Sequence, residues 1–149
     1  MNLEIIGGLL FGSHALLMSV DETLHRRRGL KKWERWGHPL DTLTVLIVIL
    51  FAMSREFTTT NLWIYAGLGI FSTLFVTKDE WIHQQDCGPV EHWLHSLLFI
   101  LHPLIFLLVY AYWSSGSFPV WFNFIPILIL TFGLYQLIFW NFLRRKHDR

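Results

Sequence analysis

The chain has few charged residues, and this scarcity is the first guide to its surroundings. Only 15% of its 149 residues are charged, whereas 53% are hydrophobic and 17% are aromatic. A water-soluble domain carries about 25% charged residues. The deficit, together with thirteen Phe and eight Trp, indicates that lipid is the solvent for much of the chain. The net charge of +1 is too small to indicate an acidic or a basic partner.

Cysteine and the common cofactor motifs are scarce or missing. The single Cys87 cannot form an internal disulfide, which excludes a disulfide framework. The sequence has no Gly-rich phosphate loop, no G-x-S-x-G nucleophile turn, no haem-attachment motif and no flavin or nicotinamide fingerprint. We expect no nucleic-acid partner. The first apolar run follows Glu4 without a basic region or a small-residue cleavage site, so we expect a retained membrane helix rather than a signal peptide.

Long apolar runs predict the fold. A spanning helix needs about 20 mostly apolar residues, and lipid admits only helices and closed barrels. The runs here are continuous rather than alternating, which indicates helices, and the two shortest helices must continue into polar flanks. We predict an all-α integral membrane protein, a single domain over 1–149, with five transmembrane helices at about 3–20, 40–53, 62–76, 93–113 and 118–143.

Basic residues are concentrated in two polar segments, which predicts the orientation in the membrane. They are Arg26, Arg27, Arg28, Lys31, Lys32 and Arg35 after the first apolar run, and Arg144, Arg145, Lys146 and Arg149 in the tail. The loop between the second and third spans contains one basic residue, Arg55, and the loop between the fourth and fifth contains none. Because short cytoplasmic loops collect Lys and Arg, we predict an outside N-terminus and a cytoplasmic C-terminus in a cell or inner membrane, with membrane lipids as partners.

The two predicted cytoplasmic loops share a motif. Residues 21–25 and 79–83 both read D-E-x-x-H, and each motif is followed by a turn with Gly and Pro and then by another apolar run. We interpret this as an internal repeat of a helical hairpin, over about 1–57 and 58–115, with a fifth helix at 118–143. Two such hairpins would be related by an axis along the membrane normal.

Two prolines are predicted to begin helices. Proline is favoured at the first helical position, so Pro39 and Pro89 would start the second and fourth helices and place Asp41 and Glu91 in first turns. An alternative register aligns 34–38 with the start of the fourth helix. It is less favoured, because proline disfavours helix at the residue before it and would leave 34–38 outside the second span.

Acids and histidines at helical spacing predict a metal site. Glu22 and His25 share a helix face, as do Glu80 and His83, and the second and fourth helices would each add one acid. The predicted metal ligands are Glu22, His25, Asp41, Glu80, His83, Glu91 and His95, with His38, His14 and His102 as second choices. Asp21 and Asp79, four residues before the histidines, are alternatives to Glu22 and Glu80.

This set resembles the ligand scheme of ferritin-like di-iron carboxylate proteins, which place Glu-x-x-His on two helices and one acid on each of two others. The resemblance covers only the residues around the loops. It departs from the scheme because Asp41 replaces Glu, because extra histidines are present, and because the helices are membrane spans. The clustered H-x-x-H-H boxes of membrane hydroxylases and desaturases are absent, so we do not assign the chain to those enzymes.

The ligand types narrow the metal and the chemistry. Carboxylate and imidazole without thiolate suit iron, manganese or zinc, and the resemblance implies two ions, iron first. The leading hypothesis is a di-iron oxidoreductase that hydroxylates or desaturates an apolar or lipid substrate at the cytoplasmic face, with an external electron donor. The alternatives are a zinc-dependent intramembrane lipid hydrolase and a metal-ion transporter or metal-handling membrane protein.

Small residues predict one helix contact. Gly8 and Gly12 form a G-x-x-x-G in the first span, and Gly67 and Gly69 lie in the third. Small residues let membrane helices approach closely. We therefore expect the first and third spans to pack against each other and to bring their D-E-x-x-H motifs together.

Overall fold

The computed structural model describes residues 2–80 and 87–144, without the side chain of Asp79. Within these residues, five helical segments are long and apolar enough to cross a membrane: Leu3–Arg28, Lys32–Ser54, Thr59–Lys78, Pro89–Ser114 and Val120–Leu143. The predicted fold class is confirmed, and the segments indicate an integral membrane protein. His83 lies outside the described residues, so the structure does not test the second D-E-x-x-H motif.

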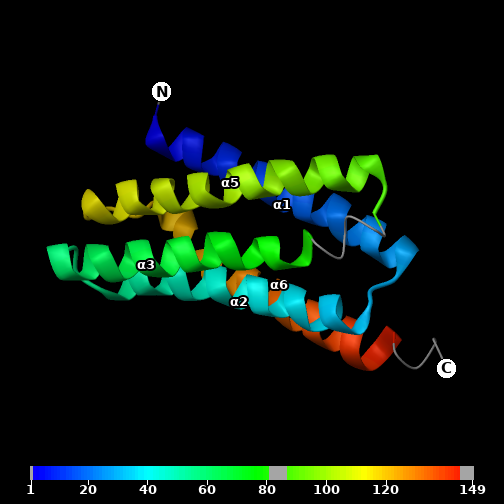
Figure 1. Ribbon diagram of the computed structural model, residues 1–149. Coiled ribbons are helices and arrows are strands. Elements are labelled where there is room, and N and C mark those ends of the chain that lie inside the picture. The colour runs from blue at the N-terminus through cyan, green and yellow to red at the C-terminus, as the bar shows by residue number, and fades with distance from the viewer. Residues whose placement is uncertain (1, 81–86, 145–149) are drawn as a thin grey trace.

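The chain runs back and forth along one long axis (Figure 1). The elements are α1 (Leu3–Arg28), α2 (Lys32–Ser54), α3 (Thr59–Phe75), η1 (Val76–Asp79), α5 (Pro89–Ser114), η2 (Val120–Phe124), α6 (Ile125–Ile138) and the π-helical η3 (Phe139–Leu143). Gly29, at φ 85°, ends α1 in a conformation that glycine adopts without strain. We call the end of the bundle that carries Arg26, Arg28 and Lys32 the basic end. The helices α1 and η3 end there, and α1 begins at the opposite end (Figure 1).

The central helix is α2, which packs against α6, α3 and α5, while α1 packs against α5. The Thr42 hydroxyl donates to the Gln136 amide oxygen at 2.8 Å and links α2 to α6. The predicted packing of the first and third spans through glycines is wrong. A Cβ placed on Gly8, Gly12 or Gly67 would meet no atom within 4 Å, so these glycines do not mediate close helix contact.

The prediction that Pro39 begins the second helix is also wrong. The helix α2 begins at Lys32, encloses Pro39, and contains Glu34 in its first turn. Proline removes the backbone N–H that would pair with the carbonyl four residues earlier, which is that of Arg35. The Asn141 side chain of η3 donates to this carbonyl at 3.0 Å, and the tertiary contact satisfies the group that the proline leaves unpaired.

Pro89 behaves as predicted and lies in the first turn of α5, as does Glu91. The N-cap residue is Gly88, whose extended backbone leads directly into the proline. The proline costs no helical hydrogen bond there, because the first N–H groups of a helix have no partner within it. Glu91 therefore enters the bundle from a fixed helix start.

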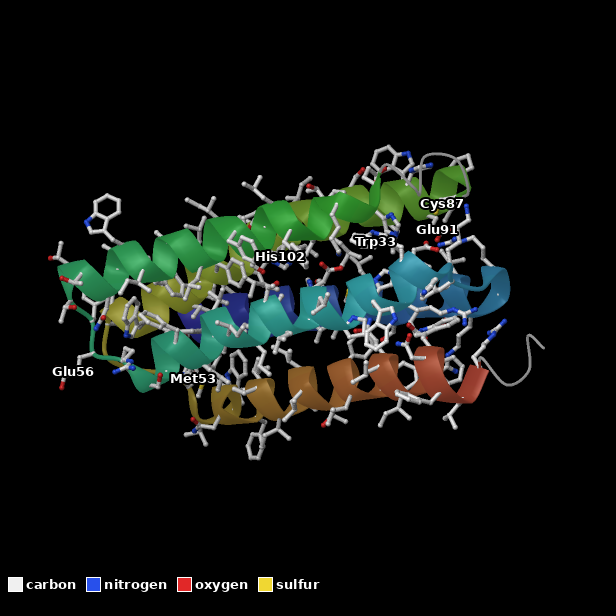
Figure 2. The ribbon with its side chains drawn as sticks, turned by 60° about the horizontal axis from the view of Figure 1, so that its bottom comes forward. Trp33, Met53, Glu56, Cys87, Glu91 and His102 are labelled. Atoms are coloured by element: carbon white, nitrogen blue, oxygen red, sulfur yellow. The ribbon has the colours of Figure 1, made fainter. Side chains whose placement is uncertain are left out.

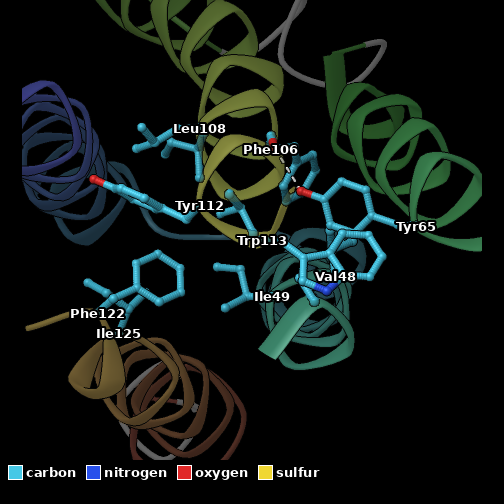
Figure 3. Close-up of a cluster of buried hydrophobic side chains, with 12 residues drawn as sticks. Val48, Ile49, Tyr65, Phe106, Leu108, Tyr112, Trp113, Phe122 and Ile125 are labelled. Carbon is cyan, nitrogen blue, oxygen red and sulfur yellow. Dashed lines mark hydrogen bonds between the residues drawn. The ribbon is translucent and has the colours of Figure 1, made fainter. Parts of the chain in front are cut away.

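The apolar core lies toward the end opposite the basic end and is rich in aromatic rings (Figure 3). Its buried members include Val48, Ile49, Tyr65, Phe106, Val109, Tyr112, Trp113 and Phe122. The buried Tyr65 hydroxyl donates to the Phe106 carbonyl at 2.7 Å, and the Trp113 indole donates to the Arg55 carbonyl at 2.6 Å. Buried aromatic groups with polar tips need such partners. The core thus holds one end of the bundle, and polar groups occupy the other.

Candidate metal centre

Four side chains that can bind a metal converge between α1 and α5. Asp21 and His25 come from α1, and Glu91 and His95 come from α5. All four are buried, and each offers a ligand atom such that these atoms lie within 4.8 Å of one another. In both helices the acid precedes the histidine by four residues, which places each pair on one helix face. We call these four residues the four-ligand group.

The contacts within the group have the lengths of hydrogen bonds. Asp21 approaches both histidines, with Oδ2 at 3.3 Å from His25 Nδ1 and Oδ1 at 3.0 Å from His95 Nε2. His25 Nε2 lies 3.2 Å from Glu91 Oε1. His25 thus faces the two acids with different nitrogens, and it could give only one of them to an ion. A site for one ion therefore rests on the 4.8 Å limit within which one atom of each residue lies.

Buried carboxylates lie in and beside the group. Arg28 donates to Glu91 Oε1 at 3.2 Å and to Glu34 Oε1 at 2.8 Å. The Glu34 side chain is fully buried and also accepts from the Lys31 backbone N–H at 2.8 Å. The imidazoles of His25 and His95 face Asp21 and Glu91. Buried charge must be paired, and a divalent cation would be a further partner for these acids.

Glu80 lies beside the four-ligand group. Its Oε1 is 3.2 Å from His92 Nδ1, and its Oε2 is 3.8 Å from His95 Nδ1. The 3.8 Å separation is too long for a hydrogen bond, and Glu80 Oε2 has no hydrogen-bond partner among the described residues. Glu80 therefore bonds to His92 rather than to His95, and its predicted role as a metal ligand stays a prediction together with that of His83.

Two predicted ligands make other contacts. Glu22, although buried, accepts hydrogen bonds from Tyr135 Oη, from Trp140 Nε1 at 3.4 Å and from Arg26 Nε at 3.4 Å. Asp41 Oδ1 lies 2.6 Å from Lys78 Nζ. Neither acid belongs to the four-ligand group, and their role as ligands stays a prediction.

Three further histidines surround the group at different depths. The His38 ring centroid lies 4.7 Å from that of His25. His14 and His102 lie nearer the middle of the bundle, with ring centroids 6.5 Å apart. Figure 2 shows His102 well along the bundle from Cys87 and Glu91, which lie at the basic end. His38 is therefore adjacent to the four-ligand group, whereas His14 and His102 form a separate deeper pair.

A hydrogen-bonded chain fixes the ring state of His102. The Thr44 hydroxyl donates its proton to the Asp41 carbonyl at 2.8 Å, so at the 2.8 Å contact between Thr44 and Ser72 the donor is Ser72. Ser72 then accepts at 3.0 Å from His102 Nε2. His102 thus carries a proton on Nε2, an assignment that follows from the network.

A cavity of about 540 Å³ adjoins the four-ligand group. Asp21, His95 and His38 line its basic end, His14 and His102 line its middle, and Phe11 and Trp121 line its far end. Most of the remaining wall is aliphatic or aromatic. Its volume is in the range of about 300–1,000 Å³ of small-molecule sites, which are mainly apolar with a few polar groups. A metal at the four-ligand group would therefore face an apolar chamber.

Sequence patterns do not identify several of the residues that surround the four-ligand group. Arg28 was interpreted only as an orientation determinant, and Glu34 was placed outside the second helix. Tyr135 and Trp140 of the last span, which bind Glu22, show no charge or motif. Asp21 was an open alternative, and its signal was the shared spacing of four in Asp21–His25 and Glu91–His95.

The comparisons with known proteins do not add a function to this geometry. No known protein family, no curated protein and no solved structure matches the chain.

Proposed function

We propose that the protein is a membrane-embedded, metal-dependent oxidoreductase that acts on an apolar substrate. The observation that carries the proposal is that Asp21 and His95 belong both to the buried four-ligand group and to the wall of the apolar cavity. A bound ion and a bound apolar molecule would therefore be neighbours. The basic end would face the cytoplasm, as the concentration of Lys and Arg there favours.

The donor set favours iron over softer or harder ions. Two imidazoles and two carboxylates give the N and O ligands that iron, manganese and zinc share, and sites with two histidines and a carboxylate are typical of non-haem iron oxygenases. Such an ion would activate dioxygen. Hydroxylation would place one oxygen atom in a C–H bond of the substrate and reduce the other to water, with two electrons and two protons from an external donor.

The residues around the group perform the protein's part of this chemistry. The Glu91–Arg28–Glu34 contacts would hold Glu91 in orientation. The aliphatic cavity wall keeps the substrate dry and close to Asp21 and His95. A second ion with Glu80 and His83 among its ligands would complete the di-iron scheme that the sequence resembles, and His92 lies 3.2 Å from Glu80 as a further nitrogen ligand outside that scheme.

Metal content tests the proposal and separates it from the zinc hydrolase. We expect purified protein in detergent to bind about one iron per chain at the four-ligand group, or two if the second site fills. Asp21→Asn and His95→Ala should each lose that iron, because both remove a buried ligand while Asn keeps the shape of Asp. His147→Ala is the matched control for a histidine change. One zinc per chain would favour the hydrolase, and wild-type levels of metal in both ligand variants would reject the site.

Substrate oxidation is the second readout. Iron-loaded protein in membrane lipid extract, supplied with ¹⁸O-labelled dioxygen and a chemical reductant, should yield lipids that gain one ¹⁸O atom or lose two hydrogens. His95→Ala should abolish both products in the mass spectrum. Equal product from wild type and His95→Ala would contradict an enzymatic role of the group.

A further inference from the structure

A seam between α1 and α6 connects the cavity to the bundle surface. At the basic end the two helices are joined by the contacts of Tyr135 with Glu22 and with Arg26. At the other end the Phe11 ring lies 5.6 Å from Phe122 and 6.0 Å from Trp121. The described helix–helix packing of α1 is mainly against α5 rather than α6. Side chains thus close the seam at both ends.

The middle of the seam is lined by small, exposed residues. Gly8, Gly12, Ala15 and Ser19 follow one another at spacings of four, three and four, which places them on one face of α1. All four are exposed and all four line the cavity. Across the seam, Leu128 of α6 is 62% exposed and lines the same cavity. These residues are exposed and also belong to the cavity wall. The cavity therefore reaches the lipid-facing surface between α1 and α6.

A second, smaller cavity continues the seam toward the basic end. Its volume is about 310 Å³, and its lining includes Ser19, Thr23, Arg26, Phe132 and Tyr135. Ser19 and Phe132 also line the main cavity. The two spaces are therefore neighbours on either side of these residues, with the smaller one nearer Arg26 and the apolar one deeper in the bundle.

Positive charge gathers at the mouth of the smaller cavity. The Arg26 side chain is 51% exposed, donates to Tyr135 Oη at 2.7 Å and lies 4.8 Å from the Phe139 ring centroid. Arg144 donates to the Arg26 carbonyl at 2.6 Å, and Arg27, the next residue along α1, is exposed. Glu22 is the one acid in the lining. Basic residues at a membrane surface attract anionic lipid headgroups.

We propose that one acyl chain of an anionic phospholipid enters the main cavity between α1 and α6 while its headgroup is held at Arg26. The smaller cavity takes the headgroup, the small residues of α1 admit the chain, and the apolar chamber holds it. The chain then runs past Asp21 and His95, so its headgroup-proximal carbons face the four-ligand group. The bound phospholipid would be the substrate of the proposed enzyme. Its oxidation rests on the proposed function, whereas its binding in the cavity does not.

Photolabelling in lipid tests the proposal. The full chain is placed in phosphatidylcholine nanodiscs with trace phosphatidylglycerol that carries a diazirine in one acyl chain, irradiated, digested and examined by mass spectrometry. Ile105 and Phe106 line the cavity but are only 4% and 5% exposed, so adducts there require a chain inside the chamber. Trp63, 74% exposed on α3, reports labelling from the bilayer.

Matched variants separate the seam from general lipid contact. Gly12→Trp should strongly lower adducts at Ile105 and Phe106 without changing those at Trp63. Gly67→Trp is the control, since Gly67 is also exposed with open space around its Cα but lies on α3 outside the cavity lining. Arg26→Gln should lower the preference for phosphatidylglycerol over phosphatidylcholine by about fivefold, the effect of one basic residue at an anionic surface.

The outcomes are distinct. Adducts confined to exposed residues, or equal cavity labelling in Gly12→Trp and Gly67→Trp, would overturn the proposal. Equal labelling by both headgroups, or stronger competition by free fatty acid than by phosphatidylglycerol, would overturn the headgroup assignment. Metal is measured in the same samples: cavity labelling without metal would reject the proposed enzyme and keep the lipid site, whereas metal without cavity labelling would do the reverse.

Discussion

Cys87 lies beside the candidate metal centre, and its surroundings lower the reactivity of its thiol. Burial, and after it the hydrogen bond to the Glu91 carboxylate, raise the pKa of the Cys87 thiol to about 12. A cysteine binds metal or attacks electrophiles only as the thiolate. Although Cys87 lies close to Glu91 in the bundle (Figure 2), the thiol is therefore a hydrogen-bond donor to a ligand rather than a ligand.

The raised pKa predicts slow alkylation of Cys87 with an unusual pH profile. Below the pKa the thiolate fraction grows tenfold per pH unit, so the iodoacetamide rate should keep rising through pH 10, whereas an ordinary thiol levels off near its pKa of about 8.5. At pH 8 the rate should be about a thousandfold below that of an ordinary thiol. Cys87→Ser with Ser117→Cys, at an exposed position, supplies the ordinary thiol. A plateau for Cys87 below pH 9 would contradict the assignment.

At the scale of elements, the contact between α2 and η3 decides the course of the second span. Pro39 leaves the Arg35 carbonyl without its helical partner, and Asn141 Nδ2 donates to it at 3.0 Å. The same amide also donates to the Leu137 carbonyl at 3.2 Å. One side chain of the last span therefore allows α2 to continue through a proline, which keeps Glu34 and His38 inside the helix beside the metal centre.

This contact predicts a pairwise dependence. Asn141→Leu should destabilise the protein by about 1–3 kcal/mol, the cost of a buried backbone acceptor left unpaired. Pro39→Ala restores the N–H of residue 39, so the same Asn141 change should cost much less in that background. The measurement is unfolding in detergent by circular dichroism for the four proteins of the cycle. Equal costs in both backgrounds would show that Asn141 does not act through the Arg35 carbonyl.

At the scale of the whole molecule, the bundle divides into an aromatic end and an ionisable end. The core cluster around Tyr112 and Phe122 holds the helices at one end, while Asp21, Glu34 and Glu91 are buried toward the other. The basic residues of the first loop mark that second end. The proposed chemistry therefore occurs at one membrane face, and the orientation of the whole bundle decides which compartment supplies electrons.

The orientation predicts which end a membrane-impermeant reagent reaches. In a Cys87→Ser background, Glu56→Cys and Lys32→Cys place single cysteines at exposed positions on opposite ends. A membrane-impermeant maleimide should label Glu56→Cys on intact cells, but Lys32→Cys only after permeabilisation. The opposite pattern would place the basic end and the metal centre outside.

The sequence by itself determined the number of spans, the lipid environment and the supply of ligands, because continuous apolar length and helical spacing act within a single helix. It also determined the start of α5 at Pro89. It did not decide which acid of a D-E pair joins the four-ligand group. Asp21 and Glu22 are consecutive, so their side chains point about 100° apart around the helix, and only the neighbours distinguish them.

The tertiary structure made that decision. Asp21 faces α5 and approaches His95, whereas Glu22 faces α6 and accepts from Tyr135. Likewise, Asn141 overrides the local preference at Pro39, and the gap between α1 and α6 turns a glycine motif expected to pack helices into part of a cavity wall. Each of these outcomes depends on which groups lie across an interface, and a rule that acts within one helix carries no information about them.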